Sequence, residues 1–160
     1  MGRKQLDRLE LMTHAFLPLT AAALESALAL MHAFYTEEAL EYVEPRARRA
    51  LELLLADPAR GKFIFIHRDE RPAGYFVITA GFSLEFAGPF ALLDEFYVAP
   101  TERGMGLGAL ALEHIFLTAR SLGVAAIRLE VDRANPRVRA FYERSGFVAH
   151  DRDLMTKWFE

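Results

Sequence analysis

The sequence predicts an α/β fold in one domain, built around a mixed sheet of six or seven strands flanked by about four helices. Strand-like apolar runs occupy the middle of the chain, segments with helical apolar spacing lie on either side, and glycine or proline marks the joins. The length of 160 residues, without internal repeat or linker, fits a single domain over residues 1–160.

The N-terminal part predicts one strand and two helices. A weak strand is expected at 8–13. Thr20 is a candidate N-cap for a helix over 21–35, which carries apolar residues on one face. Pro45 suits the first position of a second helix over 45–56.

The remainder alternates between strands and helices. A turn at Arg71-Pro72 is expected between the first two of three central strands, which we expect at 62–67, 73–82 and 90–98. A long helix over 104–122 follows, with Gly123 in the C′ position, and then a buried strand over 126–131.

The last helix has clear boundaries in the sequence. Asn135 and Pro136 form an N-cap and first helical position, and Gly146 ends the helix about ten residues later. Two final strands are expected at 147–149 and 154–158.

Composition excludes several classes of protein. A pI near 6 and a net charge of −3, without a basic run, argue against a nucleic-acid partner. The absence of cysteine removes disulfides and thiolate nucleophiles, and the five histidines show no metal-ligand spacing, so no metal is expected. The N-terminus does not resemble a signal peptide, and no apolar stretch is long enough for a bilayer. We therefore expect a cytoplasmic protein without a membrane partner.

Residues 98–115 carry the sharpest chemical signal. A strand ends at Val98, Pro100 stops the sheet ladder, and three glycines at alternate positions precede a helix. Glycine lets the backbone approach a ligand, and the free N–H groups at a helix N-terminus attract anions. The pattern predicts a diphosphate site, to which Arg103 adds a planar, permanently charged group.

Other interpretations compete for this loop. It could be a tight turn without a ligand. Gly104, Gly106 and Ala109 also satisfy the dinucleotide fingerprint G-x-G-x-x-G/A, but that fingerprint usually opens the first βαβ unit of a larger sheet. A Walker A loop would end in Gly-Lys-Ser/Thr, which is absent here.

Two motifs resemble those of the GNAT N-acetyltransferase superfamily. Arg103, Gly106 and Gly108 match its R/Q-x-x-G-x-G/A motif, and NPRVRAFYERSGF at 135–147 matches its second signature. The resemblance is strong over 90–147. It implies the GNAT acyl-CoA N-acyltransferase fold and an enzyme that moves the acetyl group of acetyl-CoA directly to an amine, without a metal.

The resemblance also implies the cofactor site. The glycine loop would hold the pyrophosphate of acetyl-CoA, and the preceding strand and an asparagine would bind the pantetheine arm. The Val98 N–H is the expected partner of the acetyl carbonyl. The implied cofactor-binding residues are Phe96, Tyr97, Val98, Arg103, Gly104, Met105, Gly106, Leu107, Gly108, Asn135, Phe141 and Tyr142.

Tyr142 matches the family's general acid, which would protonate the departing thiolate, although a core tyrosine is the plainer interpretation. Three carboxylates are candidates for the base: Asp94, Glu130 and Glu95. Strand alternation would send Asp94 and Glu95 to opposite faces of the sheet. A strand carboxylate that pairs with arginine or faces water is an equally good interpretation for each of the three.

A small primary amine is the expected acceptor, with a polyamine-like molecule favoured by a group of acidic residues that could frame its entrance: Glu37, Glu38, Glu41, Glu44 and Glu85. The segment DEFYV is also similar to the diamine acetyltransferases. The alternatives are a protein N-terminal acetyltransferase, an aminoglycoside acetyltransferase and a non-catalytic CoA-binding or regulatory module. A homodimer is a candidate assembly.

Overall fold

The computed structural model describes residues 13–159, which divide into two compact units, one ending at Leu129 and the other beginning at Glu130. The first unit holds the sheet and most helices. Its elements are β1 (His14–Pro18), the 3-10 turn η1 (Ala21–Ala23), α2 (Leu24–Glu37), α3 (Glu44–Ala56), β2 (Gly61–Arg68), β3 (Arg71–Ser83), β4 (Gly88–Val98), η2 (Pro100–Glu102), α4 (Leu107–Ser121) and β5 (Ile127–Leu129). The second unit contains one helix, α5 (Pro136–Arg144).

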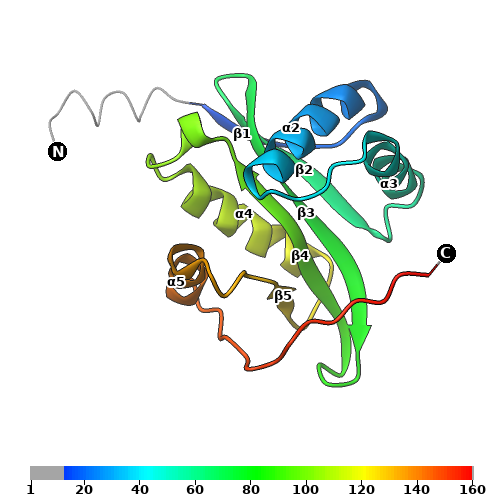
Figure 1. The fold of residues 1–160 in the computed structure, drawn as a ribbon, viewed down its shortest axis with the longest axis vertical. Coiled ribbons are helices and arrows are strands. Elements are labelled where there is room, and N and C mark those ends of the chain that lie inside the picture. The colour runs from blue at the N-terminus through cyan, green and yellow to red at the C-terminus, as the bar shows by residue number, and fades with distance from the viewer. Residues whose placement is uncertain (1–12, 160) are drawn as a thin grey trace, which may run out of the picture. The chain divides into compact units, whose positions relative to one another are not determined.

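The five strands form one sheet in the order β1-β2-β3-β4-β5. Neighbouring strands are antiparallel except for β4 and β5, which are parallel. The long strands β3 and β4 run through the middle of the unit (Figure 1). Aromatic and β-branched residues dominate β2 and β3, and such side chains fit a pleated surface buried on both faces.

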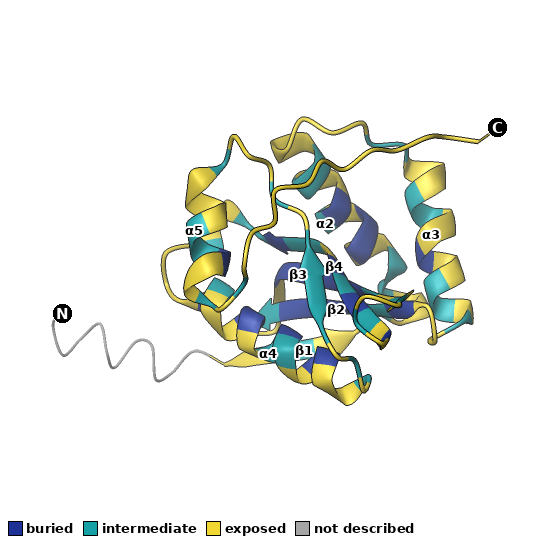
Figure 2. Ribbon diagram, turned by 90° about the horizontal axis from the view of Figure 1, so that it is seen from below, coloured by how far each residue is buried: buried dark blue, intermediate teal, exposed yellow. Residues whose placement is uncertain are grey.

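Helices cover both faces of the sheet, with α2 and α3 on one face and α4 on the other (Figure 2). The cluster beneath α2 and α3 includes buried residues from helices and strands: Ala27, Leu28, Met31, Leu51, Phe63, Phe65, Tyr75, Val77 and Tyr97. On the opposite face, the His114 ring of α4 stacks on Phe16 at 4.1 Å between centroids and lies 6.1 Å from Phe76. Burial lowers the pKa of His114, as expected for a histidine that serves in packing.

Residues 13–159 form five strands rather than the expected six or seven, because the two predicted at 147–149 and 154–158 do not form. Apolar side chains there, such as Val148 and Met155, are 76% and 90% exposed. A strand is stabilised by a ladder partner and a buried face, and this segment finds neither among the described residues. Instead, Arg133 holds it within the second unit, through the Arg152 carbonyl oxygen and the Asp153 carboxylate.

Several boundaries also differ at the N-terminal side. The strand predicted at 8–13 lies outside the described residues except for its last position, and the first described strand is β1. Thr20 precedes η1 in an extended conformation but makes no side-chain cap. The turn predicted at Arg71-Pro72 is made by Asp69 and Glu70, both with positive φ (48° and 65°), so Arg71 and Pro72 belong to β3.

Two later elements are shorter than expected. The helix predicted from residue 104 begins at Leu107, because Gly104 and Gly106 adopt positive φ. The strand predicted over 126–131 is reduced to β5, and its three residues are only half-buried.

The helix-end signals in the sequence are confirmed. Pro45 lies in the first turn of α3. Gly123 follows α4 with φ of 68°, and Gly146 follows α5 with φ of 94°. The Asn135 side chain accepts a hydrogen bond from the Val138 N–H at 3.2 Å and so caps α5.

We predict that Gly74→Ala destabilises the first unit. Gly74 pairs with Val98 across β3 and β4, and a Cβ at this position would fall on the Tyr97 carbonyl oxygen. Overpacking against backbone costs about 1–3 kcal/mol of unfolding free energy, measurable by urea denaturation. Gly81→Ala in the same strand is the control, since its Cβ would meet only the Phe90 ring, which can rotate away. Equal losses in the two variants would contradict the prediction.

Candidate active site

The C-terminal half of β4 has a strand partner on one side only. The recorded pairing with β5 covers Ala91 to Leu93, while the pairing with β3 continues to Val98. Among the described strands, the edge from Asp94 to Val98 is therefore open on the β5 side, so its N–H and C=O groups can bind an extended ligand. Phe96, the first of the predicted pantetheine-binding residues, lies on this segment with Tyr97 and Val98.

A β-bulge at Asp94 changes the orientation of the two adjacent carboxylates. Val77 of β3 lies opposite Glu95, and Ile78 lies opposite Leu93, so Asp94 is the extra residue. The expectation that Asp94 and Glu95 alternate between faces is therefore wrong, because alternation requires regular pairing. Burial is the main cause that raises the pKa of Glu95, and the like charge of Asp94 raises it further.

The glycine loop after β4 leaves the N-terminus of α4 free. Gly104 and Gly106 have φ of 80° and 83°, and no side chain caps the helix. A Cβ on either glycine would meet no other atom within 4 Å, so conformation rather than packing requires glycine here. The N–H groups of the first turn, starting with Leu107 and Gly108, remain available at the positive end of a 15-residue helix. This arrangement fits a diphosphate.

An ion pair that the sequence analysis missed holds this loop to the sheet. Arg68 at the end of β2 donates to Glu102 at 2.6 Å and to the Met105 sulfur at 3.3 Å, and its side chain is only 13% exposed. No local pattern relates residues of two elements so far apart in sequence. Arg68 therefore positions the loop without being part of its motif.

Each of the three nitrogens of the Arg103 guanidinium has a partner. Its Nε donates to the Val98 carbonyl oxygen at 2.7 Å, and its two terminal nitrogens lie 2.7 and 2.9 Å from the Glu37 carboxylate. It also lies 5.8 Å from the centre of the Tyr97 ring. A diphosphate at the loop would therefore compete with Glu37 for this group.

Glu95 is held by two tyrosines that the sequence analysis did not single out. Tyr35 of α2 donates to its Oε1 and Tyr75 of β3 to its Oε2, both at 2.6 Å. Burial raises the pKa of Glu95, and the two tyrosine hydroxyls oppose that shift. Burial and the adjacent carboxylate also raise the pKa of both tyrosines. In sequence these tyrosines are typical core aromatics, and only the fold brings them together.

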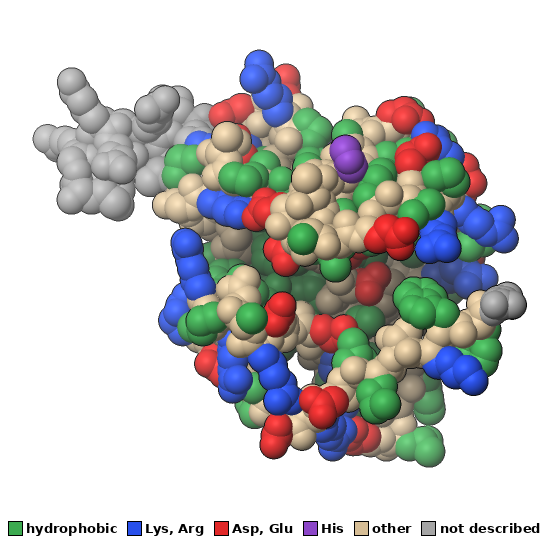
Figure 3. Space-filling view, viewed as in Figure 1, with side chains coloured by type: hydrophobic (Ala, Val, Ile, Leu, Met, Phe, Trp, Pro, Cys, Tyr) green, Lys and Arg blue, Asp and Glu red, His purple; other side chains and the backbone are tan. Residues whose placement is uncertain are grey.

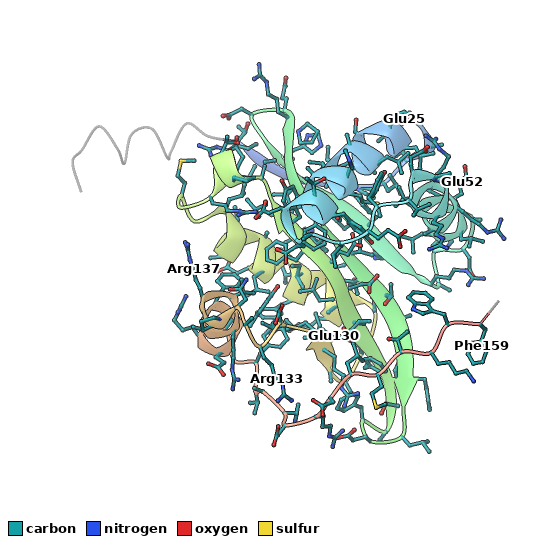
Figure 4. The ribbon with its side chains drawn as sticks, in the orientation of Figure 1. Glu25, Glu52, Glu130, Arg133, Arg137 and Phe159 are labelled. Carbon is teal, nitrogen blue, oxygen red and sulfur yellow. The ribbon has the colours of Figure 1, made fainter. Side chains whose placement is uncertain are left out.

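The other two candidate carboxylates are exposed. Asp94 lies at the bulge, and partial desolvation raises the pKa of its carboxyl group. Glu130 follows β5 directly and belongs to the second unit (Figure 4). Its role as a base stays a prediction.

Tyr142 belongs to the second unit, together with Asn135 and Phe141. Its side chain is 9% exposed and its ring lies 5.2 Å from Phe141 and 5.4 Å from Phe147. Burial raises the pKa of Tyr142 to about 12. Its hydroxyl makes no hydrogen bond with the described residues, and the hydroxyl oxygen is not completely buried. The phenol therefore keeps its proton at neutral pH and has it available to donate.

Three of the five glutamates expected to frame an acidic entrance form ion pairs with arginines. Glu37 pairs with Arg103, Glu44 with Arg48 and Glu85 with Arg128. Acidic and basic side chains are interspersed on the face that Figure 3 shows. These three glutamates are thus occupied by arginines of the same chain.

Residues 13–159 were also compared with the requirements of a metal site and of a membrane span. Residues 13–159 contain no group of three His, Cys, Asp or Glu residues that could hold a metal ion. None of the helices in this range is long and apolar enough to span a bilayer.

The open β4 edge and the glycine loop together suit an extended ligand that carries a diphosphate. The chain belongs to the acetyltransferase (GNAT) family, whose sequence profile matches residues 29–147. The resemblance noted from its two motifs is therefore confirmed.

Similar structures cover nearly the whole chain. An integron cassette protein from a salt-marsh metagenome, HFX_CASS3, is 31% identical with a TM-score of 0.79, over 91% of this chain and 90% of that one. The aminoglycoside N-acetyltransferase AAC(6')-Iy, solved with CoA, has a TM-score of 0.79 at 12% identity, over 92% and 95% of the two chains. At that identity the likeness concerns the fold alone.

One curated relative matches a shorter segment. The 5-NmdU N-acetyltransferase of Pseudomonas phage PaMx11 is 39% identical over 57 residues, which is 36% of this chain. The match spans 39% of the phage protein's length. That protein's name describes an N-acetylation.

We predict that Gly106→Val weakens acetyl-CoA binding at least about tenfold, or about 1.4 kcal/mol. Valine resists the positive φ that Gly106 adopts, and its side chain would occupy the open space above the loop. Gly123→Val is the matched control, because Gly123 also has positive φ and open surroundings but lies beyond the other end of α4. Calorimetric titration with acetyl-CoA separates the two. Unchanged affinity in a folded Gly106→Val protein would show that the loop is structural.

We predict that Glu37→Gln tightens acetyl-CoA binding, because it releases Arg103 for the diphosphate. The two side chains are 44% and 34% exposed, and a pair so accessible contributes about 0.2–1 kcal/mol. The dissociation constant should therefore fall by up to about fivefold. Glu44→Gln removes a similar exposed pair, with Arg48, and should leave the affinity unchanged. Weaker binding by Glu37→Gln would mean that the pair preorganises Arg103.

Proposed function

We propose that this enzyme transfers the acetyl group directly to a small primary amine. The observation that carries the proposal is the open β4 edge that leads into the uncapped N-terminus of α4. We further propose that residues 1–160 act as one domain and that Asn135, Phe141 and Tyr142 have the roles that the family motif implies for them.

Residues of this chain bind and polarise the donor. Acetyl-CoA supplies a thioester, whose acyl carbon accepts the amine. The N–H groups of the glycine loop, with Arg103 once it leaves Glu37, bind the pyrophosphate. The β4 edge at Phe96 and Tyr97 binds the pantetheine arm, and the Val98 N–H donates to the acetyl carbonyl oxygen.

Two proton transfers are assigned to side chains. Tyr142 donates its phenolic proton to the departing sulfur, and the support for that role is that the phenol is protonated at neutral pH and makes no hydrogen bond with the described residues. Asp94 accepts a proton from the ammonium form of the acceptor, through water where the distance requires it, and the proton that the nitrogen loses after its attack returns to the Tyr142 oxygen. The raised pKa of Asp94 brings its basicity closer to that task.

The test is release of free thiol from acetyl-CoA when primary amines are supplied. A panel of alkyl amines, aminoglycosides and peptides with free N-termini separates the small-amine acceptor from the alternatives. Turnover with peptides alone would favour a protein N-terminal acetyltransferase. Binding of acetyl-CoA without turnover on any amine would favour a regulatory module.

We predict that Tyr142→Phe lowers kcat by about 10²–10⁴-fold and leaves the KM for acetyl-CoA unchanged. The variant keeps the buried ring and removes only the hydroxyl, so the loss falls on the transition state. Single-turnover measurements exclude product release as the limiting step. Tyr42→Phe is the control, since the Tyr42 hydroxyl donates only to the Leu28 carbonyl oxygen. A wild-type single-turnover rate in Tyr142→Phe would assign Tyr142 to the core.

The same residue links pH to stability. The pKa of Tyr142 is raised in the folded protein to about 12, from an ordinary value near 10. The stabilisation is therefore complete below about pH 10 and declines as the pH rises toward 12. Urea unfolding at pH 8 and pH 11 should show a smaller decline for Tyr142→Phe than for the wild type.

A further inference from the structure

Glu95 is a partly buried carboxylate without a cationic partner. None of the described Lys, Arg or His side chains forms an ion pair with it, and the charge that acts on its pKa is that of Asp94, which has the same sign. By contrast, Glu37 on the same face pairs with Arg103. Removing an ionised carboxylate from water is costly unless an opposite charge is supplied.

The two tyrosines fix the carboxylate in one position. The Tyr75 ring is fully buried and stacks on Phe63 at 4.8 Å with an interplanar angle of 3°. The Tyr35 ring packs edge-on against Phe34 at 5.8 Å. Each hydroxyl occupies one carboxylate oxygen, and each oxygen keeps a second lone pair for another donor.

The two tyrosines that hold Glu95 belong to a cluster of aromatic rings. Phe34 lies 6.3 Å from Tyr75 and 5.7 Å from Tyr97, and Tyr75 lies 6.1 Å from Tyr97. Ring faces attract ammonium groups, and they raise the cost of an unpaired anion among them. A fixed carboxylate among aromatic rings is suited to an organic cation.

Glu95 lies on the same strand as the predicted reaction centre at Val98, but at some distance from it. Glu95 precedes Val98 by three residues, about 10 Å along a strand at 3.3 Å per residue. Asp94 lies one residue farther from Val98 than Glu95, so proton transfer from an amine at Val98 to either carboxylate would have to pass through water. The separation of Glu95 from Val98 suits a second cationic group carried a few carbon atoms away from the reacting nitrogen.

We propose that Glu95, held by Tyr35 and Tyr75, binds a second, non-reacting ammonium group of the acceptor, which is therefore a diamine rather than a monoamine. The inference rests on the proposed function, because it assumes an amine acceptor near Val98. Tyr35 and Tyr75 are positioning residues in it. Binding forms an ion pair and hydrogen bonds without a covalent step.

The test compares two acceptors of equal length, 1,4-diaminobutane and 1-aminopentane, which differ in one terminal ammonium group. Binding is measured calorimetrically at pH 7.5 on the protein saturated with coenzyme A, so that no turnover occurs. We expect the wild type to bind the diamine at least about tenfold more tightly, as a hydrogen bond to a charged group allows. Glu95→Gln should abolish that preference and leave 1-aminopentane binding unchanged.

Two further variants separate positioning from folding. Tyr35→Phe and Tyr75→Phe should each weaken diamine binding several-fold, without changing the affinity for 1-aminopentane or coenzyme A. Glu52→Gln is the charge-matched control, because Glu52 is exposed on α3, and it should keep the full diamine preference (Figure 4). If Glu95→Gln does not fold, the two tyrosine variants decide the question.

Equal binding of the two amines by the wild type, or a preference that survives the loss of Glu95 or of both hydroxyls, would overturn the inference. Thiol release tests the proposed function separately. Diamine preference without turnover would leave the Glu95 site standing while the proposed function fails. Turnover on amines without diamine preference would support the proposed function and overturn the Glu95 site.

Discussion

The site depends on the early separation of β5 from β4. Both strands pair only from Ala91 to Leu93, after which β4 continues with β3 alone. Buried backbone groups must find partners, so an edge exposed in this way is suited to an extended ligand with amide groups. The same strand then enters the glycine loop, where α4 presents its uncapped N–H groups. One geometric feature thus prepares both a backbone edge and an anion site.

The last turn of α2 connects the two ends of this site. Tyr35 reaches Glu95, and Glu37, two residues later, reaches Arg103 at the glycine loop. The contacts differ in kind: the first ends on a buried carboxylate, while the second is an exposed ion pair that a diphosphate could displace. We therefore expect the diphosphate of the cofactor to displace Glu37 from Arg103 and to leave the contact between Tyr35 and Glu95 in place. A carboxylate kept among aromatic rings costs stability, and enzymes accept such costs where function requires them.

Local sequence signals predicted the elements whose ends are fixed by backbone chemistry. Asn135 and Gly146 bound α5 as expected, because capping and positive φ are properties of single residues. The prediction of strands at 147–149 and 154–158 was wrong, because apolar composition alone does not supply a neighbouring strand to pair with. The bulge at Asp94 was also unpredictable, because it depends on how β4 registers against β3.

By itself, the sequence determined the family, the glycine loop and the expected acid Tyr142, because these reside in short motifs whose residue types carry the chemistry. Tertiary structure alone decided which charges are compensated. Arg68 and Glu102, 34 residues apart, meet at the loop, and Tyr35 and Tyr75 meet at Glu95 across separations of 60 and 20 residues. Such contacts arise when the sheet brings distant segments together, and no local pattern encodes them. The environment of Glu95, and with it the inferred diamine acceptor, follows from the fold.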